Sequence, residues 1–358
     1  APGWREGQQC WTVHKQPYDG ALGTGMVVVG IYLGREVEKL LRQSYLQAQA
    51  TRTLPPVPST NFRDPVLERD LTAQEHLQIL GKLGRGSSGD VFLIYLGRTR
   101  AGSEAGPLLH SPCRTGGYFA LKRVSKARKS EIALQRTRDE CEILRRITFP
   151  FIVQLEGIYE TAKNLYITLT YAGGGDLSNW LQCLTRETAR VVMAEVLLAL
   201  EYLHSQSIIY RDTKLENTLV AQDGHILLAD FGVAKRLDTA ITDHCTVSTK
   251  SVVGTPAYMP PEQVGSLFRA EPSAVGGAGP EEEVGYSFYV DFWAAAVMLH
   301  EMLTGEDIQD RADPQIHQPS VGGAKGGAAM SLMDEPAHDL LVRMLIPDRR
   351  RRLGCGRN

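Results

Sequence analysis

Two short polar segments separated by a predicted β-hairpin constrain this chain more than any other feature. The first, residues 212–217, reads Asp-Thr-Lys-Leu-Glu-Asn, and the second, residues 230–232, reads Asp-Phe-Gly. Between them, two short apolar runs flank an Asp-Gly turn at 223–224, a pattern that predicts paired antiparallel strands. The hairpin would present one polar segment at each end. Asp, Asn and Gly also mark ordinary surface turns, which is the competing interpretation.

The residue types and their spacing favour a chemical site over two turns. Phosphoryl transfer from ATP needs an Asp that accepts the proton of the attacking hydroxyl. It also needs an Asn and a second Asp that hold Mg²⁺ ions against the phosphates. In this chain the proton acceptor would be Asp212, and the metal ligands would be Asn217 and Asp230.

A glycine-rich segment is predicted to cover the phosphates. Residues 84–91 read Gly-Arg-Gly-Ser-Ser-Gly-Asp-Val and lie between apolar runs at 77–83 and 91–96. Alone, G-x-G-x-x-G is a weak signal, because it also begins the helix of dinucleotide-binding units. The run after this loop is rich in β-branched and aromatic residues and predicts a strand. Strand–loop–strand is the arrangement that protein kinases use.

The cation expected to orient the phosphates is Lys122, at the end of a predicted strand over 118–122. An exposed surface lysine is the alternative interpretation, since most lysines are exposed. A carboxylate partner distinguishes the two, because in protein kinases an ion pair holds this lysine against the α- and β-phosphates. We expect Glu140 to be that partner, in a segment with helical apolar spacing. Glu131 and Glu142 are alternatives that fit a solvated helix surface better.

Together these motifs resemble eukaryotic protein kinases of the AGC group, which includes protein kinase A, Akt and the ribosomal S6 kinases. Residues 210–212 (Tyr-Arg-Asp) carry the tyrosine typical of that group. Residues 214–217 look like the Akt and S6 kinase branch, and residues 352–356 are similar to the N-terminal domain of mitogen- and stress-activated S6 kinases. The resemblance covers 77–354. It implies an α+β bilobal fold: a small antiparallel β N-lobe (77–169) with one regulatory helix, and a larger helical C-lobe (173–354).

The resemblance also implies roles for individual residues. Lys214 would contact the γ-phosphate, and Thr255 would bridge it to Asp212. Asp176 would bind the ribose, although its position also suits a helix N-cap. Structural support is expected from Asp291 beneath the catalytic loop, and from a pair between Glu262 and Arg352. The residues expected to contact ATP are Leu83, Gly84, Gly86, Gly89, Val91, Ala120, Lys122, Leu169, Thr170, Ala172, Asp176 and Leu219.

The resemblance places an activating phosphosite at Ser251, four residues before Thr255, to be phosphorylated by an upstream activating kinase. Thr246, Ser248 and Thr249 are nearby alternatives. A phosphate at Ser251 would need basic partners. The resemblance assigns that pocket to Arg136, Arg211 and Lys235. The resemblance also matches Asp176 and Glu216 to acidic positions that contact arginine in basophilic relatives, which implies protein substrates with a serine or threonine near basic residues. Alternatively, both carboxylates serve only ATP binding and helix capping.

Composition narrows the class of protein. Against 39 Lys and Arg stand 41 Asp and Glu, a net charge of −2 that argues against nucleic-acid binding. No apolar run in the N-terminal region approaches the length of about 20 residues that a transmembrane helix needs. Scattered cysteines without a C-x-x-C pair favour a reducing compartment, the cytoplasm or nucleus. Residues 1–70 are predicted to be an extension and linker of unassigned role.

Several departures from the family pattern keep a second function open. Ser88 replaces an aromatic residue at the tip of the glycine loop, and a Gly/Ala-rich stretch at 319–329 stands where a substrate-docking helix is expected. The chain begins with Ala1 and stops at Asn358, before the C-terminal tail that kinases of this group carry, as a fragment would. The alternative is a pseudokinase or scaffold with an intact nucleotide pocket and impaired docking. We favour the active serine/threonine kinase, because every catalytic group is present. A small-molecule kinase would not need the full activation segment at 230–262.

Overall fold

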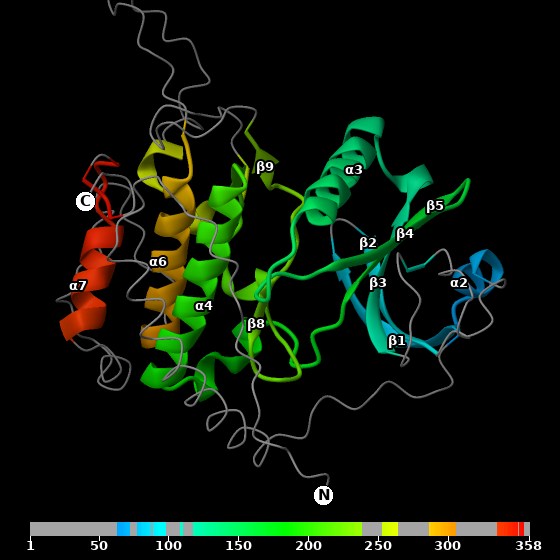
Figure 1. Ribbon diagram of the computed structural model, residues 1–358, viewed down its shortest axis with the longest axis horizontal. Helices are drawn as coiled ribbons and strands as arrows, with labels where there is room; N and C mark the ends of the chain where they lie inside the picture. Colours follow the sequence, from blue (N-terminus) through cyan, green and yellow to red (C-terminus); the bar gives the residue numbers. More distant parts are fainter. Residues whose placement is uncertain are drawn as a thin grey trace, which may run out of the picture.

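Five antiparallel strands build the N-lobe sheet in the order β1-β2-β3-β5-β4 (Figure 1). They are β1 (Leu77–Gly86), β2 (Gly89–Leu96), β3 (Gly117–Ser125), β4 (Leu155–Glu160) and β5 (Asn164–Thr170). The computed structural model describes residues 63–71, 77–86, 89–97, 108–109, 117–237, 253–263, 286–305, 335–349 and 351–353.

The two faces of the sheet carry different partners, because successive side chains of a strand point to opposite faces. On one face lies α3 (Glu131–Arg146), which begins at Ser130, whose hydroxyl accepts a hydrogen bond from the Ala133 amide. Its buried Leu134 and Cys141 pack against side chains of β3 and β5. The short helix η1 (Lys126–Arg128) connects β3 to α3.

The opposite face is covered by α2 (Pro65–Asp70), a helix within the segment that was predicted to be a linker. Asp64 caps its first turn by accepting hydrogen bonds from the amides of Val66 and Leu67. Leu67 is fully buried, and it joins a cluster with Phe92, Leu121 and other side chains of the outer sheet face. The last residues of the N-terminal extension are therefore part of the N-lobe structure.

The C-lobe is built around two long helices, α4 (Arg186–Ser205) and α6 (Tyr289–Thr304), which pack together (Figure 1). α7 (Glu335–Met344) packs against α6. The chain enters the lobe through the 3₁₀ helix η2 (Leu177–Cys183), and η4 (Pro256–Tyr258) lies beside α6. α6 is buried along nearly its whole length and ends at Gly305, whose φ of 69° is left-handed. Among the described helices, none has the length and apolar character needed to cross a membrane.

Two small sheets carry the polar segments singled out from the sequence. β7 (Thr218–Val220) pairs with β8 (Ile226–Leu228), which confirms the predicted hairpin, and η3 (Leu215–Asn217) precedes β7. β6 (Ile208–Ile209) pairs with β9 (Lys235–Arg236), so the chain returns beside the start of the catalytic loop. The β-rich N-lobe and helical C-lobe are the bilobal α+β fold that the sequence predicted.

Candidate active site

The loop that carries Asp212 is fixed from below by one buried carboxylate. Asp291, on α6, has a side chain with no solvent exposure. Its oxygens accept hydrogen bonds from the backbone amides of Tyr210 (2.9 Å) and Arg211 (2.7 Å), and His204 Nε2 lies 2.8 Å from Oδ2. Arg211 has a φ of 70°, a conformation costly for a residue with a side chain. The Asp291 contacts hold it there and so direct Asp212.

Asp212 belongs to a closed set of polar contacts. Lys214 Nζ lies 2.9 Å from Asp212 Oδ2 and donates to Thr255 Oγ1 at 2.8 Å. Thr255 Oγ1 in turn donates to Asp212 Oδ1 at 2.7 Å. The three side chains that the sequence assigned to catalysis on two distant segments therefore lie in mutual contact. This ties residues 253–263 to the catalytic loop.

Asn217 and Asp230, the two predicted metal ligands, lie at adjoining ends of the hairpin. The Ala229 amide, one residue before Asp230, donates to the Asn217 carbonyl at 2.8 Å. The Asn217 amide nitrogen donates to Asp212 Oδ2 at 2.6 Å and to the Asp212 carbonyl at 2.9 Å, which leaves the amide oxygen directed away from Asp212. Asp230 is exposed, with a φ of 53°.

This donor set fits Mg²⁺. A carboxylate and an amide oxygen are hard ligands, and Mg²⁺ is usually held by one or two carboxylates together with substrate phosphates and water. No cluster of three or more His, Cys, Asp or Glu side chains suited to a metal occurs among the described residues. A site completed by the phosphates of a nucleotide does not need such a cluster.

The buried lysine lies across from this hairpin. Lys122 Nζ donates to both carboxylate oxygens of Glu140, at 2.8 and 3.0 Å, and both side chains are almost fully buried. Burial acts to lower the pKa of Lys122, but the charges of Glu140 and Asp230 outweigh it and raise that pKa. Lys122 is therefore a cation near neutral pH, and it interacts electrostatically with the Asp230 carboxylate.

Strand register places the predicted adenine and phosphate contacts on the face that carries Lys122. Val91 lies opposite Lys122, and Ala120 lies opposite Leu169, so all four side chains share one face. Val91, Ala120 and Leu169 are only half-buried, as is Leu219 of β7, whereas Leu121 on the other face is fully buried. Half-exposed apolar side chains beside a buried cation form a surface suited to a flat aromatic ligand.

The remaining predicted ATP contacts surround this face. Gly84 lies opposite Val91, and Gly86 lies opposite Gly89 in the β1–β2 hairpin. Leu83 is 42% exposed, Thr170 ends β5 and Ala172 is buried just beyond it. These positions agree with a nucleotide site, while their individual roles stay predictions.

Asp176 forms a β-bridge with Leu219, which places it beside the same surface. Asp176 stands at the N-cap position of η2, as its sequence position suggested, but its side chain does not cap the helix. The carboxylate makes no capping bond to the backbone of η2 and instead accepts hydrogen bonds from the side chains of Ser178 and Asn179. η2 is a tight 3₁₀ helix, and the side-chain donors of Ser178 and Asn179 bond to Asp176 in place of the backbone amides that an α-helix would present.

The predicted activation site is only partly described. Ser251 lies outside the described residues. Arg211 donates to the Val233 carbonyl at 2.7 Å and to the Tyr286 hydroxyl at 3.1 Å, which ties it to the segment leading into β9. Lys235 is exposed on β9, and Arg136 is exposed on α3. The phosphate pocket therefore stays a prediction.

Sequence reasoning did not identify His204, which completes the Asp291 contact from α4. A histidine at the end of an apolar helix gives no signal of its partner, 87 residues away. It also did not identify Glu195, on the same helix, which accepts a hydrogen bond from the Ile226 amide at 2.9 Å and contacts His225 Nδ1 at 2.7 Å. Both residues support the site without facing it.

Comparison with known proteins agrees with this geometry. The family model described as protein kinase domain matches residues 77–357. The chain is 32% identical over 307 residues to a cAMP-dependent protein kinase catalytic subunit of Dictyostelium discoideum, covering 84% of this chain and 40% of that protein. It is 34% identical over 282 residues to a putative ribosomal protein S6 kinase alpha-1 of Caenorhabditis elegans, covering 78% and 31%.

A third relative is ribosomal protein S6 kinase alpha-4 of Mus musculus, 33% identical over 291 residues, with 79% of this chain and 33% of that protein covered. The chain thus spans between 31% and 40% of the length of these three relatives. The matched family and these similarities agree with the assembled lysine, catalytic loop and hairpin. This chain belongs to the protein kinase domain family, and within it to the AGC group.

Proposed function

We propose that this chain is a protein kinase that transfers the γ-phosphoryl group of ATP to serine or threonine hydroxyls of protein substrates and requires Mg²⁺. One observation carries the proposal. The Lys122–Glu140 ion pair and the contacts among Asp212, Lys214 and Thr255 are present together. A protein kinase needs the lysine pair and the catalytic loop in place at once.

The chain's own groups account for most of the chemistry. Asp212, oriented by Thr255 and Lys214, would accept the proton of the attacking hydroxyl. Lys122 would hold the α- and β-phosphates, because its cation is fixed by Glu140 in a buried position. Asn217 and Asp230 would hold Mg²⁺, which neutralises the phosphate charge when bound.

Substrate preference and regulation follow as finer parts of the proposal. Glu216 is exposed one residue before Asn217, and Asp176 is half-exposed beside β7. Two carboxylates beside the site would attract arginine or lysine near the accepting hydroxyl. We expect activation through phosphorylation of Ser251 by an upstream kinase, and action in the cytoplasm or nucleus.

The test measures γ-phosphate transfer to an arginine-containing serine peptide, before and after treatment with an upstream activating kinase. We expect transfer by the native protein in Mg²⁺, and a loss of at least about 100-fold in Asp212→Asn, the scale of a general base. Asp230→Asn should also lose transfer and should bind ATP with a weaker dependence on Mg²⁺. Asp339→Asn, in an exposed pair on α7, is the matched control and should behave as the native protein.

Peptide controls separate the finer claims. A peptide with its arginines replaced by alanine should be a poorer substrate, and one with tyrosine in place of serine should accept no phosphate. If the chain binds ATP but transfers no phosphate after activating treatment, the proposed kinase activity is refuted and the scaffold alternative is favoured. Transfer unaffected by Asp212→Asn would contradict the assigned proton acceptor.

A further inference from the structure

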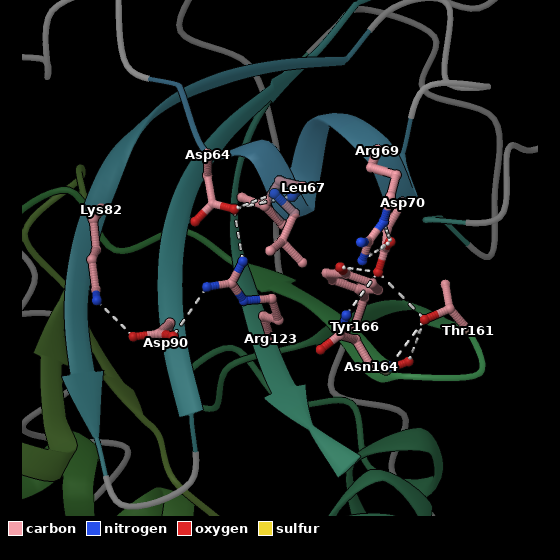
Figure 2. Close-up of polar contacts among 11 residues, drawn as sticks. Asp64, Leu67, Arg69, Asp70, Lys82, Asp90, Arg123, Thr161, Asn164 and Tyr166 are labelled. Atoms are coloured by element: carbon pink, nitrogen blue, oxygen red, sulfur yellow. Dashed lines mark hydrogen bonds and ion pairs between the residues drawn. The ribbon is translucent and has the colours of Figure 1, made fainter. Parts of the chain in front are cut away.

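α2 lies before the matched kinase domain, yet polar contacts fix it to the N-lobe at both ends (Figure 2). At its start, Asp64 Oδ1 caps the helix and also accepts a hydrogen bond from Arg123 Nη1 at 2.8 Å. The Asp64 and Arg123 side chains are 17% and 14% exposed, so solvent screens this ion pair only partly. One carboxylate therefore both begins α2 and binds β3.

At the other end, Asp70 binds the hairpin between β4 and β5. Its Oδ2 accepts hydrogen bonds from Asn164 Nδ2 at 2.7 Å and from the Tyr166 hydroxyl at 2.9 Å. Between the two ends, Leu67 is fully buried against the sheet. Two polar anchors and one apolar anchor give α2 a defined place on the outer face.

From Arg123 the charged contacts continue to the glycine-rich loop. Arg123 Nη2 donates to Asp90 Oδ2 at 3.1 Å, and Asp90 Oδ1 accepts a hydrogen bond from Lys82 Nζ at 2.6 Å (Figure 2). Asp64, Arg123, Asp90 and Lys82 thus form one series that crosses from α2 over β3 and β2 to β1. Asp90 directly follows Gly89, the last glycine of the loop, and Arg123 directly follows Lys122.

The backbone at this point explains why side-chain contacts can set the position of the loop. Gly89 has a φ of 155°, and a Cβ at this position would lie 2.2 Å from the Arg123 carbonyl oxygen. β2 and β3 therefore approach closely at the base of the loop, with no side chain of residue 89 between them. The Asp90–Arg123 ion pair lies next to this approach and holds the two strands together.

We propose that residues 63–71 form an N-terminal brace that positions the glycine-rich loop over the nucleotide site through the Asp64–Arg123–Asp90 contacts. Asp64, Arg123 and Asp90 are positioning residues in this proposal, since they act on the loop and not on ATP. A loop already held in its binding position loses less conformational freedom when a ligand binds, which strengthens binding. The effect on nucleotide affinity rests on the proposed function, whereas the effect on the loop itself does not.

Asp64→Asn separates the ion pair from the cap. Asparagine caps a helix about as well as aspartate, so α2 keeps its first turn while the charge that binds Arg123 is lost. Glu68→Gln removes the same charge from an exposed position of the same helix and is the matched control. Leu67→Ala is the second variant, because it weakens the docking of α2 without touching the ion pairs.

The first readout is backbone amide hydrogen exchange in the nucleotide-free full chain, which needs no kinase activity. We expect Asp64→Asn and Leu67→Ala to speed exchange over residues 82–91 by about three- to tenfold, the scale of a partly shielded ion pair, with α4 and α6 unchanged. Asp64→Asn should add nothing further in an Arg123→Met background. Unchanged exchange over 82–91, or an equal increase throughout the chain, would overturn the brace.

The second readout is KM for ATP against kcat. We expect KM to rise about three- to tenfold in Asp64→Asn while kcat stays within about twofold, because the binding of ATP is weakened equally in the ground state and in the transition state. A fall in Tm with KM unchanged would mean a purely structural role and would overturn the effect on affinity. A native chain that binds no ATP would refute the proposed function, and loop-specific exchange would still support the brace.

Discussion

Replacing Asp291 tests whether one buried carboxylate holds the catalytic loop in place. Asp291→Ala removes the acceptor of two backbone amides and of His204, in a position without solvent. An unsatisfied buried donor costs about 1–3 kcal/mol. Two such amides would cost about 2–6 kcal/mol. Since the variant no longer incurs the desolvation cost of the buried carboxylate, we expect a loss of about 2–4 kcal/mol in the free energy of unfolding.

Asp291→Asn refines this estimate. The side-chain carbonyl oxygen of the asparagine can still accept one backbone hydrogen bond. Its NH₂ group, however, would face the second donor, whose hydrogen bond the carboxylate had accepted. We therefore expect a smaller loss, about 1–2 kcal/mol. Both variants should also reduce phosphate transfer, because Arg211 would no longer be held in its left-handed conformation next to Asp212.

Urea unfolding followed by circular dichroism measures these losses. Asp339→Ala is the control, since Asp339 pairs with Arg343 on the surface of α7 and should change stability by less than about 0.5 kcal/mol. A loss below about 1 kcal/mol in Asp291→Ala, or a loss no larger than that of Asp339→Ala, would refute the argument.

Three further predictions rest on the N-lobe. Lys122→Met leaves Glu140 buried without its cation and should cost about 3 kcal/mol or more in thermal unfolding. Adding Glu140→Leu should restore part of this stability but no phosphate transfer; restored transfer would contradict the assigned role of Lys122. Gly89→Ala should cost more than about 1 kcal/mol, because its Cβ would meet the Arg123 carbonyl, whereas Gly84→Ala has no atom within 4 Å of its Cβ. Equal losses in urea unfolding would refute this difference. Burial acts to raise the pKa of Asp70, but hydrogen bonds from Asn164 and Tyr166 and the charge of Arg69 hold that pKa below its ordinary value of 3.8. Since the folded-state pKa is the lower one, this stabilisation is complete above 3.8 and is lost as pH falls from there through the folded-state pKa. The stability difference between the native protein and Asp70→Asn should therefore be constant near neutral pH and shrink in acid, and a difference that grew in acid would contradict the sign.

The active-site hairpin was predictable because its information is local. An Asp-Gly turn between two apolar runs gives β7 and β8 from neighbouring residues alone. The Lys122–Glu140 contact needed the family pattern to select one glutamate of three, because sequence spacing places all three on the same helix. The resemblance predicted a pair between Glu262 and Arg352. These two side chains form a bidentate ion pair, with N–O distances of 2.7 and 3.0 Å.

α2 shows what sequence reasoning missed. Its start carried a readable signal, since Asp64 followed by Pro65 is typical of a helix N-terminus. No sequence signal identified the partners of α2, because Arg123 lies 59 residues from Asp64 and Tyr166 lies 96 residues from Asp70. Asp176 shows a partial success, because the local signal places it at the N-cap position of η2, whereas its side chain bonds to Ser178 and Asn179 and not to the backbone.

The motif residues obtain their geometry from two helices that carry none of the motifs. α6 supplies Asp291 to the amides at the start of the catalytic loop, and α4 supplies Glu195 to the Ile226 amide at the start of β8. Each carboxylate is almost fully buried and accepts hydrogen bonds from backbone amides. Each therefore fixes the backbone path of the chain and not merely the rotamer of a single side chain. The same Asp, Asn and Gly residues without these anchors would form only flexible turns. It follows that side-chain substitutions within the hairpin should alter chemistry, whereas substitutions of Asp291 and Glu195 should alter the position of the whole site.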